Sequence, residues 1–140
     1  MQKQKFHKFS YYEKLFHIPI VLCTGDMEKY NQYIDKEFNA CHDDSVRSLD
    51  GFYTKFTKDI SQGVSEHHVI FINRSDDYHT LSHELIHLCA TALSDRGIGV
   101  DLKIEDETFA YVHTHLLSVL WHKVSPKPKP KKKKPLPQKK

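Results

Sequence analysis

The sequence predicts an α+β domain in which a short, mostly antiparallel sheet packs on two helices. Its 140 residues are enough for one domain with a single modest core. Apolar residues follow the period of a strand in three segments and the period of a helix in three others. The strand segments are residues 18–23, 51–57 and 67–73, and the helix segments are residues 27–38, 81–93 and 106–124. No internal repeat is visible.

The first 40 residues are expected to form two helices with a strand between them. Ser10 and Glu13 have the spacing of a capping box, which predicts a short helix that ends near residue 16. The segment "IPIVLC", residues 18–23, is rich in β-branched side chains and predicts a buried strand. Asp26 is placed to cap the helix that follows. The apolar face of that helix would consist of Met27, Tyr30, Ile34 and Phe38.

The middle of the chain predicts an antiparallel hairpin. The segment "GFYTKFT", residues 51–57, alternates like a half-exposed strand. The segment "HHVIFIN", residues 67–73, is more apolar and predicts a better-buried strand that opens with His67 and His68. A turn-rich segment separates the two strands.

Two helices are expected in the last third. Thr80 is the chosen N-cap of a helix over residues 81–93, which stops before Gly97, a residue suited to the left-handed conformation. A short extended segment, residues 100–104, leads to a helix over residues 106–124. The core stripe of this last helix would consist of Phe109, Val112, Leu116 and Leu120.

The charge is distributed unevenly, and this divides the chain into a domain, residues 1–125, and a tail, residues 126–140. The tail, "PKPKPKKKKPLPQKK", carries eight of the 21 Lys and Arg residues and no acid, so the domain has a net charge of −5. A Pro- and Lys-rich run buries no apolar surface, and we expect it to be disordered. Its expected roles are solubility or weak contact with an acidic partner or nucleic acid.

The compartment is expected to be the cytoplasm. Three cysteines without a C-x-x-C spacing indicate a reducing environment and no disulfide framework. No apolar run is long enough to span a bilayer, so no membrane partner is expected.

The motif with chemical content is "HELIH", residues 83–87. Residues four apart lie on one face of a helix, so His83 and His87 would present two imidazoles to one metal ion. Glu84 would lie beside the metal without ligating it, where a carboxylate accepts a proton from water. The composition of the chain predicts on the order of 0.04 chance matches to this pattern, so its context has to decide.

A catalytic zinc ion takes three protein ligands and leaves the fourth position to water. Glu107 follows His87 by 20 residues, in "EDETFAYVHTHLL" at the start of the last predicted helix. With this arrangement residues 67–124 resemble the gluzincins, the zinc metallopeptidases of thermolysin type. The resemblance implies a small zincin-like domain with one Zn²⁺ held by His83, His87 and Glu107. It also implies that Glu84 is the general base and that "VIFIN" is an edge strand on which a peptide docks.

One position departs from the family pattern. Many gluzincins continue the third-ligand motif as E-x-x-x-D, whereas this chain has Tyr111 at the last position. Tyr111 lies one helical turn after Glu107, and we expect it to line the site and to hydrogen-bond a ligand or a developing oxyanion. The combination of "HELIH" and "ETFAY" looks like the small metallopeptidase-like proteins of bacteriophages and prophages.

The other candidate residues have structural interpretations. His113 and His115 are rivals for a third ligand or a transition-state donor, but their position on the helix favours the surface or the edge of the core. His79 is expected to lie before the helix and outside the site. Cys89 points away from His87 and is expected to be a small core residue.

Three functions are compatible with these patterns. The first is a zinc-dependent metallopeptidase that acts on a peptide or protein substrate. The second is a zincin-fold binding or regulatory module that binds metal with little turnover. The third is a nucleic-acid-associated protein whose salt-sensitive binding depends on residues 126–140.

Overall fold

The computed structural model describes residues 4–41, 49–99, 107–125, 132 and 135–138. The predicted extended segment 100–104 and most of the predicted tail lie outside the described residues. Among the described residues, no helix is long and apolar enough to cross a membrane. These residues form seven elements, which are β1 (His7–Glu13), β2 (Ile18–Thr24), α1 (Met27–Phe38), β3 (Gly51–Ile60), β4 (Gly63–Ile72), α2 (Tyr78–Asp95) and α3 (Glu107–Val124) in the described part of the chain.

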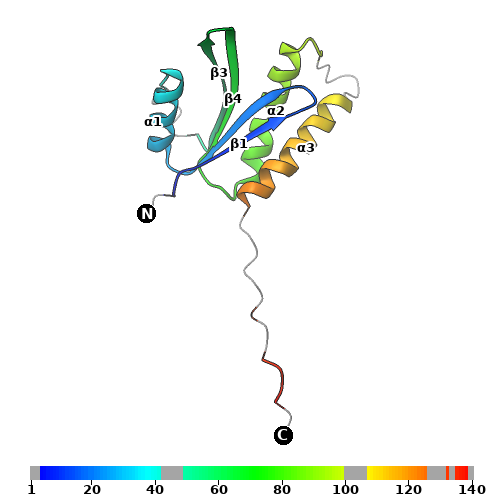
Figure 1. Cartoon of the computed structure of the whole chain (residues 1–140). Helices are drawn as coiled ribbons and strands as arrows, with labels where there is room; N and C mark the ends of the chain where they lie inside the picture. The colour runs from blue at the N-terminus through cyan, green and yellow to red at the C-terminus, as the bar shows by residue number, and fades with distance from the viewer. Residues whose placement is uncertain (1–3, 42–48, 100–106, 126–131, 133–134, 139–140) are drawn as a thin grey trace.

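Four strands form one sheet in the order β1-β2-β4-β3 (Figure 1). Two antiparallel pairs, β1 with β2 and β3 with β4, flank a parallel pairing of β2 with β4. After β2 the chain passes through α1 and then forms the β3–β4 hairpin. In this hairpin β3 is an edge strand and β4 pairs with β2. The prediction of an α+β domain with a mostly antiparallel sheet is therefore confirmed.

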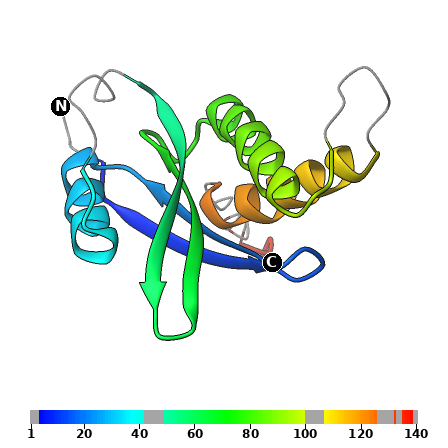
Figure 2. The ribbon, with the colours of Figure 1, turned by 90° about the horizontal axis from the view of Figure 1, so that it is seen from above.

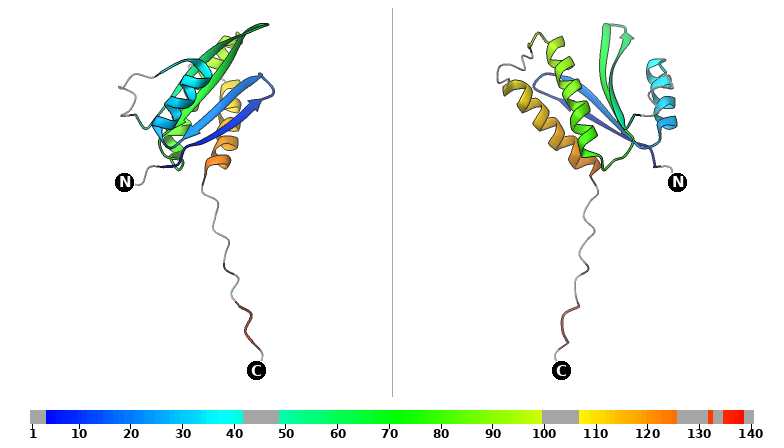
Figure 3. Two further views of the ribbon diagram at one scale, coloured as in Figure 1. Left: turned by 60° about the vertical axis from the view of Figure 1, so that its left-hand side comes forward. Right: turned by 180° about the vertical axis from the view of Figure 1, so that it is seen from behind.

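Helices cover the two faces of the sheet unequally, as the views in Figures 2 and 3 show. Side chains of β2 and β4 alternate between two apolar clusters. One cluster joins the sheet to α2 and α3 and includes Ile20, Ile70 and Ile72. The other joins it to α1, where Tyr30 and Ile34 are fully buried. The α1 stripe read from the sequence is confirmed, and Asp26 caps α1 by accepting a hydrogen bond from the Glu28 amide at 2.9 Å.

The predicted helix after Ser10 is wrong, because this segment is strand β1. Alternate residues Phe9 and Tyr11 pack on the core beside α3, so the segment has the period of a strand. The Glu13 carboxylate does not close a capping box. It accepts hydrogen bonds from the amides of Leu15 and Phe16, at 2.9 and 2.7 Å, and so stabilises the turn between β1 and β2.

The strands of the β3–β4 hairpin are longer than predicted, and β4 does not lie at the edge of the sheet. The segment expected to be rich in turns is mostly strand, and the turn precedes Gly63, whose φ of 131° suits glycine. His68 therefore lies inside β4 and is fully buried. Because β4 pairs on both sides, it is an interior strand and not the edge that the gluzincin resemblance implied. The edge strands are β1 and β3.

A close approach at Gly51 generates a test of how β3 packs against α2. A Cβ atom at this position would lie 2.5 Å from Thr80 Cγ2 and 2.7 Å from the Phe71 carbonyl oxygen. We expect Gly51→Ala to lower the free energy of unfolding by about 1–3 kcal/mol in urea denaturation, because overpacking forces the backbone to shift. Gly99→Ala is the matched control, since its Cβ would meet nothing within 4 Å. Equal effects of the two substitutions would contradict the packing.

Candidate metal centre

The helix α2 carries the motif and has two distinct sides. Its inner stripe, predicted from the sequence, is fully buried against the sheet and consists of Leu81, Leu85, Leu88 and Ala92. The opposite side exposes His83, Ile86 and His87. Cys89 is buried among the core residues, as predicted, and burial raises the pKa of its thiol to about 12. Its burial in the core keeps this thiol away from the exposed side that carries His83 and His87.

The start of α2 differs from the prediction by one turn. Asp77, not Thr80, is the N-cap, and its carboxylate accepts hydrogen bonds from the Thr80 amide at 3.0 Å and the Thr80 hydroxyl at 2.6 Å. The bond from the Thr80 hydroxyl is the main cause that lowers the pKa of Asp77. Asp77 is the N-cap because its short side chain places a carboxylate oxygen within hydrogen-bonding distance of the third amide of the helix. His79 consequently lies within the first turn of α2, not before it.

The two motif histidines meet on the exposed side of α2. Their Nε2 atoms are 3.2 Å apart, and their ring planes cross at 74°. Two Zn–N bonds of about 2.0–2.1 Å that meet at a tetrahedral angle hold their nitrogen atoms about 3.3 Å apart. The pair therefore fits two positions of one zinc ion. The same separation also fits a hydrogen bond between one protonated and one unprotonated nitrogen, so metal binding has to be measured.

A shallow hollow of about 340 Å³ lies beside the pair, between the start of β3 and the first turns of α2. Its lining includes His83 and Glu84, and Glu84 is only 9% exposed. Sequence reasoning missed two other side chains that line it, His79 and Asp50. The regular spacing of histidines at 79, 83 and 87 was a signal for the first. No local pattern pointed to Asp50, because pairing of distant strands brings it there.

The remaining predicted site residues lie on α3. Glu107 is its first residue and is exposed, and Tyr111 is 64% exposed with its ring parallel to that of His115. Among the described residues, no three side chains of His, Cys, Asp or Glu form a group that could hold a metal. The structure thus brings His83 and His87 together but does not bring Glu107 to them.

Two histidines of α3 connect elements of the fold. The ring of His113 contacts the carbonyl oxygen of Ser82 on α2, with its Nε2 atom at 3.1 Å. The Nε2 atom of His115 lies 3.1 Å from the Tyr11 hydroxyl on β1. Both side chains are half-buried, which agrees with the expected position at the edge of the core.

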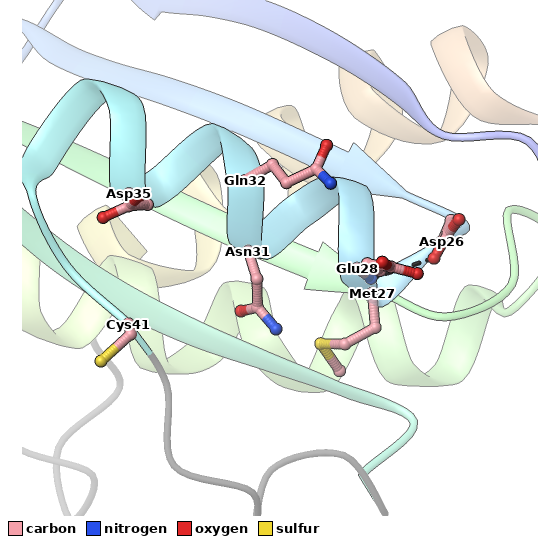
Figure 4. Close-up of a pocket in the computed structure, with 7 residues that line it drawn as sticks. All are labelled: Asp26, Met27, Glu28, Asn31, Gln32, Asp35 and Cys41. Atoms are coloured by element: carbon pink, nitrogen blue, oxygen red, sulfur yellow. Dashed lines mark hydrogen bonds between the residues drawn. The ribbon is translucent and has the colours of Figure 1, made fainter.

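A larger hollow, of about 780 Å³, lies along α1 on the other face of the sheet (Figure 4). Asp26, Glu28 and Asp35 contribute carboxylates, and Asn31 and Gln32 contribute amides. None of the described residues that line it is a histidine, and α1 is separated from α2 by the sheet (Figure 2). This hollow is therefore separate from the motif and offers no ligand to it.

Comparisons with known proteins give no relative of the chain. No protein-family model matches, and no match was found among curated proteins or solved structures. The functional argument consequently rests on the residues of the chain itself.

The capping of α2 generates a prediction about the helix that carries the motif. Asp77→Ala removes both hydrogen bonds to Thr80, so we expect the free energy of unfolding to fall by about 0.5–2 kcal/mol. Urea denaturation followed by circular dichroism measures this loss. Asp76→Ala is the control, because the neighbouring Asp76 is exposed and paired only with Arg74 at the surface. If the control loses as much stability as Asp77→Ala, the assigned cap is wrong.

Proposed function

We propose that the chain is a zinc-dependent hydrolase of peptide bonds, in which His83 and His87 hold one Zn²⁺ ion. The observation that carries the proposal is the 3.2 Å separation of the two Nε2 atoms on the exposed side of a helix whose opposite side is buried. The adjacent Glu84 and the hollow beside it provide a carboxylate and a space for a substrate. The resemblance of "HELIH" and "ETFAY" to the gluzincins points in the same direction.

Each residue has a separate role in this proposal. When bound, zinc lowers the pKa of a coordinated water molecule and polarises a carbonyl group. Glu84 accepts a proton from the attacking water and delivers it to the leaving amine. By the resemblance, Glu107 is the third ligand, and Tyr111 hydrogen-bonds a ligand or the developing oxyanion. Both of these side chains are exposed on α3 and are free of the core.

Metal binding is the first test. We expect the purified chain to hold one zinc ion, measured by elemental analysis, and to lose it to a chelator. His83→Ala and His87→Ala should each abolish stoichiometric binding, because each removes one nitrogen of the pair. Glu107→Gln should weaken zinc affinity in a competition titration, because the amide replaces a charged ligand.

The control for these variants is His122→Ala, which removes an exposed histidine from the last turn of α3. It should retain the full zinc content. If both His83→Ala and His87→Ala still bind zinc, the metal centre is not at these residues. The contact between the two histidines in wild type is then a hydrogen bond.

Turnover is the second test. Glu84→Gln should keep zinc and lower peptidase activity by about 10²–10⁴-fold, because a general base contributes that much. Tyr111→Phe should also keep zinc, with a loss of up to about 10²–10³-fold if the hydroxyl stabilises an oxyanion. A fluorogenic peptide library measures both. A Glu84→Gln protein without zinc would contradict the role of this residue as a base that does not ligate the metal.

A second candidate function is a metal-dependent binding module with little turnover. It is favoured by the exposure of Glu107 and Tyr111 and by the shallow form of the hollow beside His83. The same two measurements separate the candidates. Stoichiometric zinc without cleavage of any library peptide supports the module, whereas cleavage that depends on Glu84 supports the hydrolase.

A further inference from the structure

A polar cluster lies beneath the C-terminal half of α2, on the face of the sheet that α2 and α3 cover. We call it the His68 cluster, and it consists of Tyr53, Glu66, His68, Thr91 and Arg96. His68 is at its centre, on β4, and its side chain is fully buried. None of these residues belongs to the proposed metal centre, which lies nearer the other end of α2.

The hydrogen bonds of His68 define its uncharged form. The Tyr53 hydroxyl lies 2.7 Å from Nδ1, and the two rings stack at an angle of 7°. If this hydroxyl donates, Nδ1 is an acceptor and the ring proton is on Nε2. Among the described residues the Nε2 atom has no hydrogen-bond partner, and it faces the Glu66 carboxylate at 3.5 Å. With the Tyr53 hydroxyl as the donor, the imidazole is neutral and its Nε2–H is directed toward an acid.

Arg96 extends the cluster to a distant turn. Its guanidinium binds the Glu66 carboxylate and donates to the carbonyl oxygens of Phe16 and His17, in the turn between β1 and β2. It also donates to the Ala92 carbonyl at 2.8 Å. The last turn of α2 is thus attached to the sheet and to the β1–β2 turn through one side chain.

The charges around His68 are balanced only while its ring is neutral. Its own strand contributes Glu66, and β3 contributes Tyr53 and Lys55. Helix α2 contributes Cys89 and Asp95, and its C-cap residue is Arg96. Strand β2 places the apolar Ile20 beside the ring. Arg96 binds Glu66, and Lys55 binds Asp95 at 2.8 Å. Each of the two acids therefore already has a cation. A protonated His68 would add a third positive charge to a group of partly exposed charges with two negative ones, at the one position that is fully buried.

We propose that His68 is the proton-sensitive element of a lock that holds the C-terminal turn of α2 on the sheet. Protonation of the ring makes Nδ1 a donor, so it can no longer accept the hydrogen bond from Tyr53. The charged ring is then solvated only when the cluster opens to water. Opening detaches Arg96 from the β1–β2 turn and frees the end of α2.

The direction of the pH response follows from the ring's two environments. Burial is the main cause that lowers the pKa of His68 in the closed state, and Arg96 lowers it further, while Glu66 partly opposes both. In the open state the ring has its ordinary pKa of about 6.5. Below pH 6.5 opening is coupled to proton uptake, so the opening equilibrium rises by up to about tenfold per pH unit until the closed state also binds the proton.

Amide hydrogen exchange at the end of α2 tests the lock in the full chain. The amides of Arg96, Gly97 and Ile98 donate to carbonyls of Leu93 and Ser94 and report the opening of this turn. After correction for intrinsic exchange rates, their protection should fall between pH 6.5 and pH 5.0 by up to about tenfold per pH unit. In the His68→Gln variant the protection should not depend on pH, because the side-chain amide oxygen can accept the hydrogen bond from Tyr53 and the amide does not titrate.

An exposed pair of the same chemistry supplies the control. The Tyr12 hydroxyl lies 2.8 Å from Nδ1 of His17, but both side chains are exposed. Tyr12→Phe should keep the pH response of wild type. A response that persists in His68→Gln, or protection in wild type that stays constant from pH 7.5 to 5.0, overturns the proposal.

A measurement on the wild-type ring keeps the test valid if His68→Gln fails to fold. Long-range ¹H–¹⁵N spectra at neutral pH should show the proton of His68 on Nε2, and the ring should titrate below pH 6.5. A proton on Nδ1, or titration at or above pH 6.5, contradicts the lock independently of any variant.

Discussion

The packing of α2 against the sheet is the contact on which the rest of the structure depends. Its buried stripe, with Leu81, Leu85 and Leu88, meets Ile70 and Ile72 of β4 and is fully excluded from water. Burial of one such side chain contributes about 1.5–3 kcal/mol to the free energy of unfolding. Rotation of the helix about its axis would expose several of these side chains at once and lose each contribution. The orientation of α2 is therefore fixed, and with it the outward direction of His83 and His87.

The path of the chain through the sheet decides what lies next to that exposed side. The parallel pairing of β2 with β4 places β4 in the interior, so the hairpin carries β3 to the edge. The start of β3 then lies against the first turn of α2, where Gly51 leaves room for the backbone of Phe71 and the side chain of Thr80. This contact brings Asp50 to the hollow beside His83 and Glu84. A substrate or ligand of the motif would meet β3 and not β4.

Histidine side chains have opposite environments near the two ends of α2. His83 and His87 are exposed and unconstrained by other elements, which suits side chains that bind an ion from solution. His68 is held between a phenol and a carboxylate, and that carboxylate is already paired with Arg96 when the ring gains a second proton. The Tyr12–His17 and Tyr53–His68 pairs have the same atoms in contact and differ in burial. Burial, not residue type, determines whether the imidazole is a surface group or a part of the core.

Short-range periodicity was sufficient for the stripe of α1, the stripe of α2 and the shared face of His83 and His87, because these depend on residues three or four apart. It failed for β1, because the segment with the capping pattern of Ser10 and Glu13 pairs with β2 as a strand. It also failed for the start of α2, where Asp77 and not Thr80 is the N-cap. The sequence by itself thus determined which residues share a helix face. Tertiary structure alone decided the interior position of β4, the arrival of Asp50 and the burial of His68, because each depends on contacts between segments distant in the chain.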